Sequence, residues 1–522
     1  MTEGSVVERS HRLDATQRRL LLGVCTVVGA ATVVPATYNY VLDPMLDGLG
    51  ASESQSSLLR QLPSIAALLV IFLAGVLGGR WGERRLIGAG SVLFAAGCAV
   101  VVVAPTLEVA VGGLVLESVG ASALVVVALG LLSARVSEPE ARASAFATFA
   151  VVGPCVYMFA PVLAGVLVDD LGWRWVPVLW TLAGLVMVAA ARRLLPGGDS
   201  ERAPGELLTP ALAGLVLALG VQAINAVSSD GWTSSSFAIR AGATVLAVLA
   251  LLWAYRRSPA PSLSVAALRR GGTLVLLVVV VIVPFANLWF YMTMGYQYVY
   301  GLDTLSTALV MIPAQLCGVG GGLVARKVLR RHGITRAGVG AILLLSAALA
   351  ATWLIGVGSP IVVPVLVMCT YSSASVAAGI PLTNAVMDSA PPGESGSAAA
   401  FRGAAANVGS ALGVVVMTAV VFGVVATSLT ATLDSEGLAG QQSADIAASM
   451  RNGATSESVA SDYSVPVQQV DEISAAQKGA MVDGLHAQGT VAALLTAGCA
   501  GIFLLGRRRQ TRARPTVGSA AG

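Results

Sequence analysis

The chain has 522 residues, of which 56% are hydrophobic and 11% are charged, with a net charge of +4. Soluble domains carry about 25% charged residues, so this composition excludes a soluble globular protein. Runs of roughly twenty apolar residues recur along most of the chain, and each is long enough to cross a bilayer as a helix. We therefore expect an all-α polytopic membrane protein, with membrane lipids around it and no nucleic acid as a partner.

Hydropathy predicts fourteen membrane spans joined mostly by short connections. The expected spans are 20–42, 57–79, 85–104, 108–132, 143–168, 174–193, 208–227, 236–255, 273–295, 304–325, 336–356, 361–386, 399–427 and 489–506. Lys and Arg gather in every second connection and in both terminal segments. The positive-inside rule then places both termini in the cytoplasm, as an even number of spans requires.

A short internal repeat indicates two halves. The pattern Gly75-x-Leu-x-x-Arg80 returns as Gly321-x-Leu-x-x-Arg326, again at the basic end of an apolar span. Two related bundles with a substrate site between them are common among secondary transporters. The expected units are a tail (1–19), a six-helix bundle (20–195), two linker helices (196–258), a second six-helix bundle (259–506) that includes a long outer loop (428–488), and a basic tail (507–522).

The stretch from Gly75 to Leu86 reads GVLGGRWGERRL, a glycine-rich helix end followed by a burst of arginine. Buried guanidinium groups are costly in lipid, so the span must end at about Arg80. Glycines let helix ends approach closely. The stretch resembles the signature loop between the second and third spans of the major facilitator superfamily. The resemblance implies a gating role for its glycines and arginines, which are Gly75, Gly79, Arg80, Gly82, Arg84 and Arg85.

Three further stretches resemble the fourteen-span drug:proton antiporter branch of that superfamily. They are Ala160-Pro161-Val-Leu-Ala-Gly165, Trp173-Arg174-Trp175, and the run 381–396 with its continuation Gly409-Ser-Ala-Leu-Gly413. Pro161 is expected to kink its helix, and Gly165 to permit a close helix crossing. The resemblance implies a major facilitator fold of two six-helix bundles plus two intervening helices. It also implies proton-coupled efflux of amphipathic drugs by alternating access, in a monomer of the bacterial inner membrane.

Three departures from this branch concern the charges used for proton coupling. Pro35 stands near the usual aspartate of span 1, Leu116 stands where span 4 usually has an arginine, and Gly79 replaces the acid of the loop. Charges inside spans are functional candidates by default, and Glu117 and Arg60 are the candidates here. We hypothesise that Glu117 exchanges a proton and that Arg60 tunes it or meets an anionic substrate. The alternative is a static structural ion pair.

Uncharged polar residues inside spans are the candidates for a substrate cavity, because buried amides and hydroxyls require partners. Interhelical hydrogen bonds are the simpler explanation for each of them. Span 9 is the strongest case, since aromatic side chains cluster there around an expected kink at Pro284. The candidates are Tyr38, Asn39, Asn287, Tyr291, Gln315, Asn384 and Asn407.

The sequence offers no sign of an enzyme, a metal site or a cofactor. The six cysteines lie inside expected spans, and the three histidines lie far apart. No phosphate-binding glycine loop is present, so any pumping must draw on a gradient. Three alternatives stay open: export of an endogenous lipid, siderophore or secondary metabolite, a non-transporting sensor or scaffold, and an integral-membrane enzyme such as a lipid-linked transferase.

Overall fold

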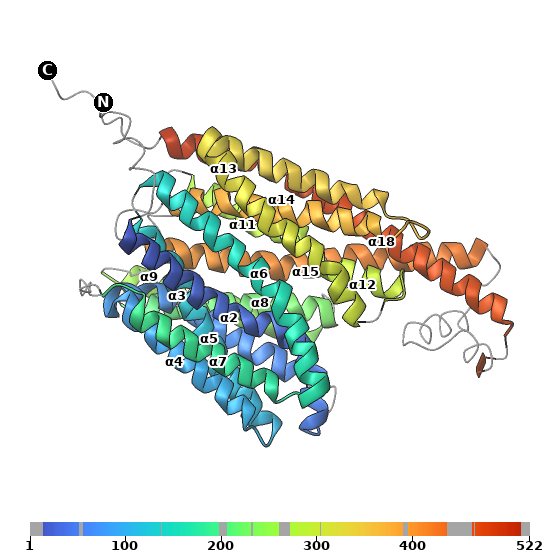
Figure 1. Ribbon diagram of the computed structural model, residues 1–522, viewed down its shortest axis with the longest axis horizontal. Coiled ribbons are helices and arrows are strands. Elements are labelled where there is room, and N and C mark those ends of the chain that lie inside the picture. Colours follow the sequence, from blue (N-terminus) through green and yellow to red (C-terminus); the bar gives the residue numbers. More distant parts are fainter. Residues whose placement is uncertain are drawn as a thin grey trace.

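The computed structural model describes residues 14–51, 56–136, 138–197, 206–230, 233–259, 272–302, 304–389, 395–435, 462–463 and 465–512. These residues form an all-helical bundle (Figure 1). The helices of the first part are α2 (Ala15–Gly48), α3 (Ser56–Trp81), α4 (Glu83–Val102), α5 (Leu107–Arg135), α6 (Pro139–Leu171), α7 (Trp175–Arg193), α8 (Leu208–Asp230) and α9 (Ser235–Arg257). Those of the second part are α11 (Thr273–Ile282), η2 (Val283–Ala286), α12 (Trp289–Tyr298), α13 (Thr304–Ala350), η3 (Ala351–Leu354), α14 (Val362–Met387), α15 (Ser395–Ser435) and α18 (Val467–Arg512).

The expected spans correspond to these helices. Thirteen helices among the described residues are long and apolar enough to cross a membrane. One of them, α13, contains two expected spans, because Gly333 with φ 73° interrupts its helical geometry. Such a φ favours glycine, which turns the chain without strain. Span 9 is divided into α11, η2 and α12, so the kink expected at Pro284 is confirmed.

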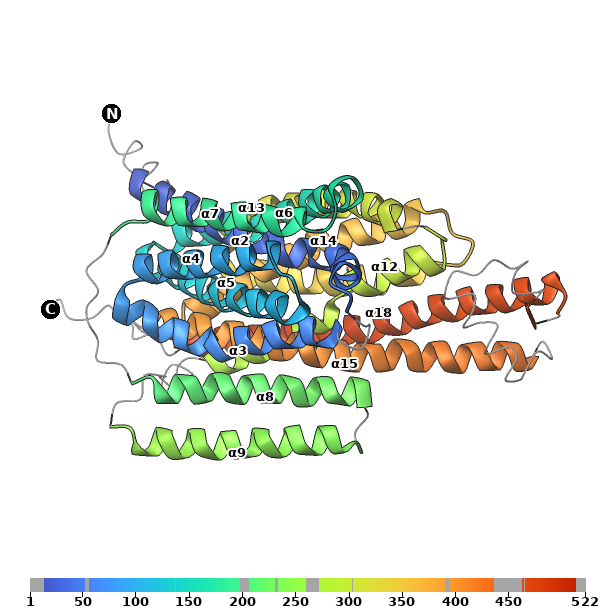
Figure 2. The same cartoon turned by 90° about the horizontal axis from the view of Figure 1, so that it is seen from below.

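Two hydrophobic cores organise the bundle. One is built from α2 to α8, and the other from α11 to α14 with α18. Helix α15 joins both: Ala400 and Ala404 are buried in the first core, whereas Met417 and Val421 are buried in the second. Helices α8 and α9 lie side by side along one flank of the bundle (Figure 2).

The two ends of the bundle differ. Helix α2 begins and helix α18 ends at the same end, which we call the termini side (Figure 1). At the opposite end α15 and α18 run together beyond the other helices (Figure 2). The sequence predicts a loop over 428–488, but α15 continues to Ser435 and α18 starts at Val467. The rest of that stretch lies mainly outside the described residues.

Candidate functional site

The two cores meet along a seam near the termini side. Phe72 of α3 packs edge-on against Phe401 of α15, with ring centroids 5.5 Å apart. Close by on the same two helices, Gly403 leaves space for Ile71, whose Cδ1 lies 2.9 Å from the position that a Cβ would take. A small apolar cluster formed by Ala147 of α6, Leu329 and Ala337 of α13 and Ile380 of α14 also belongs to the seam.

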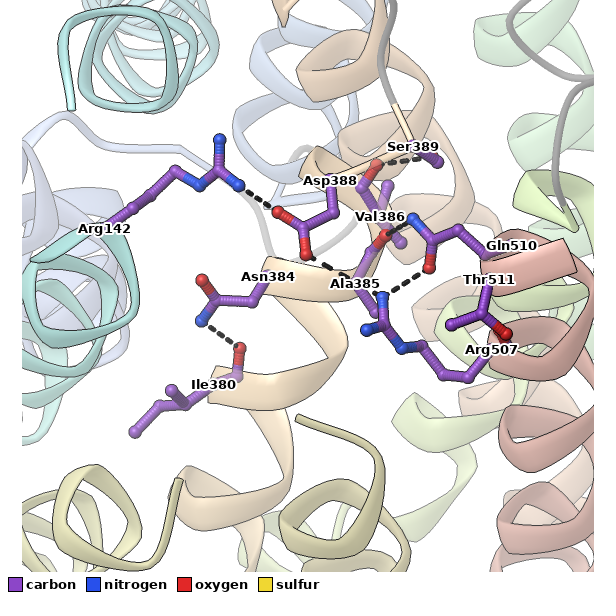
Figure 3. A network of polar contacts seen from close by, with 10 residues as sticks. All are labelled: Arg142, Ile380, Asn384, Ala385, Val386, Asp388, Ser389, Arg507, Gln510 and Thr511. Atoms are coloured by element: carbon purple, nitrogen blue, oxygen red, sulfur yellow. Dashed lines mark hydrogen bonds and ion pairs between the residues drawn. The ribbon is translucent and has the colours of Figure 1, made fainter. Parts of the chain in front are cut away.

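A network of charged side chains extends the seam toward the termini side (Figure 3). The Arg142 guanidinium of α6 donates to Asp388 Oδ1 at the end of α14. Arg507 Nη1 of α18 lies 3.7 Å from Asp388 Oδ2 and donates to Gln510 Oε1. Gln510 Nε2 in turn donates to the Ala385 carbonyl at 3.1 Å. One carboxylate therefore joins a helix of the first core to two helices of the second.

The Asp388 side chain is only 6% exposed, so its charge requires compensation. Two guanidinium groups provide it, and both are themselves only partly accessible. Breaking a buried ion pair by removing one partner costs more than losing an exposed pair, because the other charge stays buried. The network therefore favours the arrangement in which α6, α14 and α18 are held together at this end.

Sequence reasoning alone does not single out Asp388, Arg142 or Arg507. Asp388 lies within the run 381–396, whose sequence signal is its resemblance to the antiporter branch. The partners on α6 and α18 are distant in sequence, and no pattern identifies them.

The glycine- and arginine-rich loop, for which the sequence predicts a gating role, lies at the termini side between α3 and α4. Gly82, with φ 87°, makes the turn between them. Arg84 Nη2 donates to the Arg192 carbonyl of α7 at 2.5 Å, which ties the loop to the end of another helix. Gly79 has open space where a Cβ would lie, so an acid there would meet no steric barrier. Gly75 and Arg80 lie in the last turns of α3, and Arg85 is exposed on α4.

Glu117 lies inside the first core rather than at the seam. Its side chain is 4% exposed, and Ser118 Oγ donates to its Oε2 at 3.0 Å. Around it α5 crosses α4 closely: a Cβ on Gly97 would lie 2.5 Å from Glu117 N, and one on Gly120 would lie 2.6 Å from Gly90 O. The side chain of Arg60 lies outside the described part of the chain, so the predicted pairing of Glu117 with Arg60 stays a prediction.

The other candidates of the first core have structural contacts. Tyr38 OH donates to the Leu59 carbonyl at 2.8 Å, and its ring stacks on Trp180. Asn39 is exposed. In α6, Ala160 and Pro161 are buried. Gly165 has no neighbour within 4 Å of the position that a Cβ would take, so the close crossing expected there is absent in this conformation of the described residues.

Four candidates of the second core have separate polar contacts. Tyr291 OH lies 3.0 Å from Thr418 Oγ1, and the exposed Asn287 accepts a bond from Gln488 Nε2 at 3.0 Å through its carbonyl. Asn384 and Asn407 each donate to the carbonyl four residues earlier in their own helix, at 2.9 Å. Gln315 is partly buried on α13. Within the described ranges, no group of three or more His, Cys, Asp and Glu is arranged to hold a metal ion.

The sequence has relatives among known proteins. A family model described as Major Facilitator Superfamily matches residues 20–414. The chain is similar to the major facilitator superfamily multidrug transporter mfsC of Aspergillus fumigatus, with 24% identity over 56% of this chain and 57% of that relative. It is also similar to the probable multidrug resistance protein EmrY of Escherichia coli, with 25% identity over 42% of this chain and 44% of that relative. The matched regions thus span about half the length of these relatives.

The fold has counterparts among solved structures. The crystal structure of the human organic anion transporter MFSD10 (TETRAN) superposes with a TM-score of 0.58 at 14% identity, covering 94% of this chain and 98% of that one. At this identity the likeness establishes the fold alone. The family match over most of the chain and the shared fold lead to the same conclusion: the chain belongs to the Major Facilitator Superfamily.

Proposed function

We propose that this protein is a secondary active exporter of amphipathic small molecules, driven by protons and working by alternating access. We place it in the fourteen-span drug:proton antiporter branch, in accord with relatives that are named a multidrug transporter and a probable multidrug resistance protein. The two bundles, 20–195 and 259–506, rock against each other, and 196–258 supplies the linker helices. The protein acts as a monomer in a bacterial inner membrane, with both termini in the cytoplasm.

The observation that supports this proposal best is the charged network at the seam. Asp388 joins Arg142 of α6 to Arg507 of α18, and both contacts lie at the termini side. With the termini in the cytoplasm, these contacts close the bundle toward the cytoplasm. Export requires a second state in which α6 separates from α14, so the ion pair must break and form again in every cycle.

Proton coupling is assigned to Glu117, with Arg60 as its partner. Glu117 is the acid buried in the middle of a span of the first core. Its carboxyl group is held by Ser118 on its own helix, so protonation leaves its local contact in place. A static structural role is the competing account, and the substitution described in the Discussion separates the two.

The test uses purified protein in proteoliposomes loaded with a fluorescent cationic drug such as ethidium. We expect export that depends on a pH gradient and stops when a protonophore is added. No transport in either condition would favour a sensor or scaffold. Transport of lipids or secondary metabolites without drug transport, in a panel of substrates, would favour an exporter of endogenous compounds.

A further inference from the structure

Arg402 is an unusual charge at the seam. It lies within the apolar part of α15, in the stretch Ala-Ala-Ala-Phe-Arg-Gly-Ala-Ala-Ala (398–406). From the start of α15 at Ser395, a rise of 1.5 Å per residue places it about 10 Å along the helix. A guanidinium at this depth is costly unless another group compensates its charge.

No acid in the described part of the chain provides that compensation. Arg402 makes no ion pair or hydrogen bond with the described residues, and its Nε is buried without a partner. Arg142, by contrast, lies at the same seam and forms an ion pair with Asp388. Arg402 as a whole is only partly buried, and its terminal nitrogens are not among the atoms that are buried without a partner.

The position of Arg402 also argues against a side chain that simply extends to the lipid headgroups, as an arginine near the end of a span often does. Phe401 packs on Phe72 of α3, and Gly403 faces Ile71 of the same helix. The turn of α15 that carries Arg402 therefore packs against α3, a helix of the first core. When α3 and α15 separate during the cycle, this guanidinium is uncovered between the two halves.

We propose that Arg402 binds the anionic group, a carboxylate or phosphate, of an amphipathic substrate. The guanidinium offers a planar fork of donors that matches either group. Phe72 and Phe401 offer apolar surface for the rest of the molecule. This inference rests on the proposed export function and makes its substrate class more specific: amphipathic organic anions are accepted at the seam, in addition to any uncharged or cationic drug.

The experiment compares two ligands with the same dansyl group and alkyl chain, 11-(dansylamino)undecanoic acid and its methyl ester, which differ in the charge of the carboxylate and in one added methyl group. Binding is measured by dansyl fluorescence with the full chain in nanodiscs of phosphatidylcholine. We expect the wild-type protein to bind the acid about tenfold more tightly than the ester, as loss of one hydrogen-bonded charge contact predicts. R402K keeps the charge but loses the planar fork, so it should keep only part of this preference. R402Q should abolish the preference while ester binding stays unchanged.

The matched control is R330Q, which removes an exposed arginine of α13 from the same side of the protein. It should keep the acid preference, and an equal loss in R330Q would overturn the proposal. An unchanged preference in R402Q would also overturn it. Nanodiscs with one-third phosphatidylglycerol identify the source of the anion: loss of the acid preference there would assign Arg402 to a lipid headgroup and overturn the substrate proposal.

A failure of the anion-site proposal can be distinguished from a failure of the export proposal. Ethidium export by R402Q, measured in proteoliposomes, reports on transport without an anionic ligand. Normal ethidium export together with an unchanged acid preference would reject the anion site alone. Acid-selective binding in a protein that exports nothing would reject the export function and leave the site in place.

Discussion

Asp388 and Glu117 are both acidic residues with almost no exposed surface, yet their surroundings are opposite. Asp388 faces Arg142 of α6 across the seam and Arg507 of α18 within the second core. Glu117 is held by Ser118 on its own helix, in a region where glycines bring α4 and α5 into backbone contact. The difference indicates that the two regions are held together by different kinds of interaction. Charges join the parts that must separate in each cycle, and close backbone packing joins the helices that stay together.

The largest effect is expected from overpacking the region around Glu117. In Gly97→Val the new Cβ would lie 2.5 Å from Glu117 N and from Gly113 O, and these backbone atoms cannot move aside. We expect a loss of stability of about 3 kcal/mol or more, and little folded protein. Fluorescence-detected size-exclusion chromatography measures the folded fraction. Gly88→Val on the same helix is the control, because open space surrounds Gly88 and folding should be normal.

Glu117→Gln tests whether this region has a role beyond packing. The amide keeps the shape of the side chain and can still accept from Ser118. We therefore expect normal folding and complete loss of transport driven by a pH gradient, measured as ethidium export from proteoliposomes. Export at the wild-type rate would show that Glu117 is structural. Ser118→Ala, which removes the neighbouring hydroxyl, should reduce export far less.

Asp388→Asn tests the seam in the same way. The substitution leaves two arginines without their counter-ion, and we expect closure at the termini side to weaken by about 1–3 kcal/mol, between the values of exposed and buried pairs. Export should fall about tenfold. Opening is measured by labelling a cysteine introduced at Ala147, which is buried at the seam, with a membrane-impermeant maleimide.

Two results would contradict this account of Asp388. Labelling of the Ala147 cysteine at the wild-type rate in Asp388→Asn would show that the network does not hold the seam closed. Faster labelling after Arg330→Gln, which changes an exposed residue, would show that the effect is one of general charge. Arg142→Gln, which removes the partner on α6, should resemble Asp388→Asn.

The architecture is predictable from the sequence because its signals are local. Apolar length and the alternation of Lys and Arg define the spans without reference to distant residues. Pro284 and the glycine-rich turn at Gly82 also act on their own segments of chain, and the structure has a break and a turn there. The extension of α15 to Ser435 is not predicted, because polar, serine-rich sequence is typical of a loop. The extension of α18 is indicated in part, because residues 470–485 have helical periodicity within the expected outer loop.

The site is less predictable, because it depends on which distant residues meet. Asn384 and Asn407 are polar residues inside spans, but each donates to its own helix, which no hydropathy pattern reveals. Conversely, Arg142 and Asp388 are 246 positions apart and meet only through the packing of α6 on α14. Hydropathy identifies Glu117 as a charge inside a span, but it does not show which distant charges form a pair.

The smallest effect is expected from adding one methyl group at the seam, and it sharpens the comparison with the region around Glu117. In Gly403→Ala the new Cβ would lie 2.9 Å from Ile71 Cδ1, the end of a flexible side chain. That atom can move, and alanine raises helix propensity by up to about 1 kcal/mol, so stability should be unchanged or slightly higher. Gly97→Ala adds the same methyl against rigid backbone and should be destabilising. Thermal unfolding followed by tryptophan fluorescence compares the two variants, and equal loss of stability in both would mean that the seam is packed as rigidly as the α4–α5 crossing.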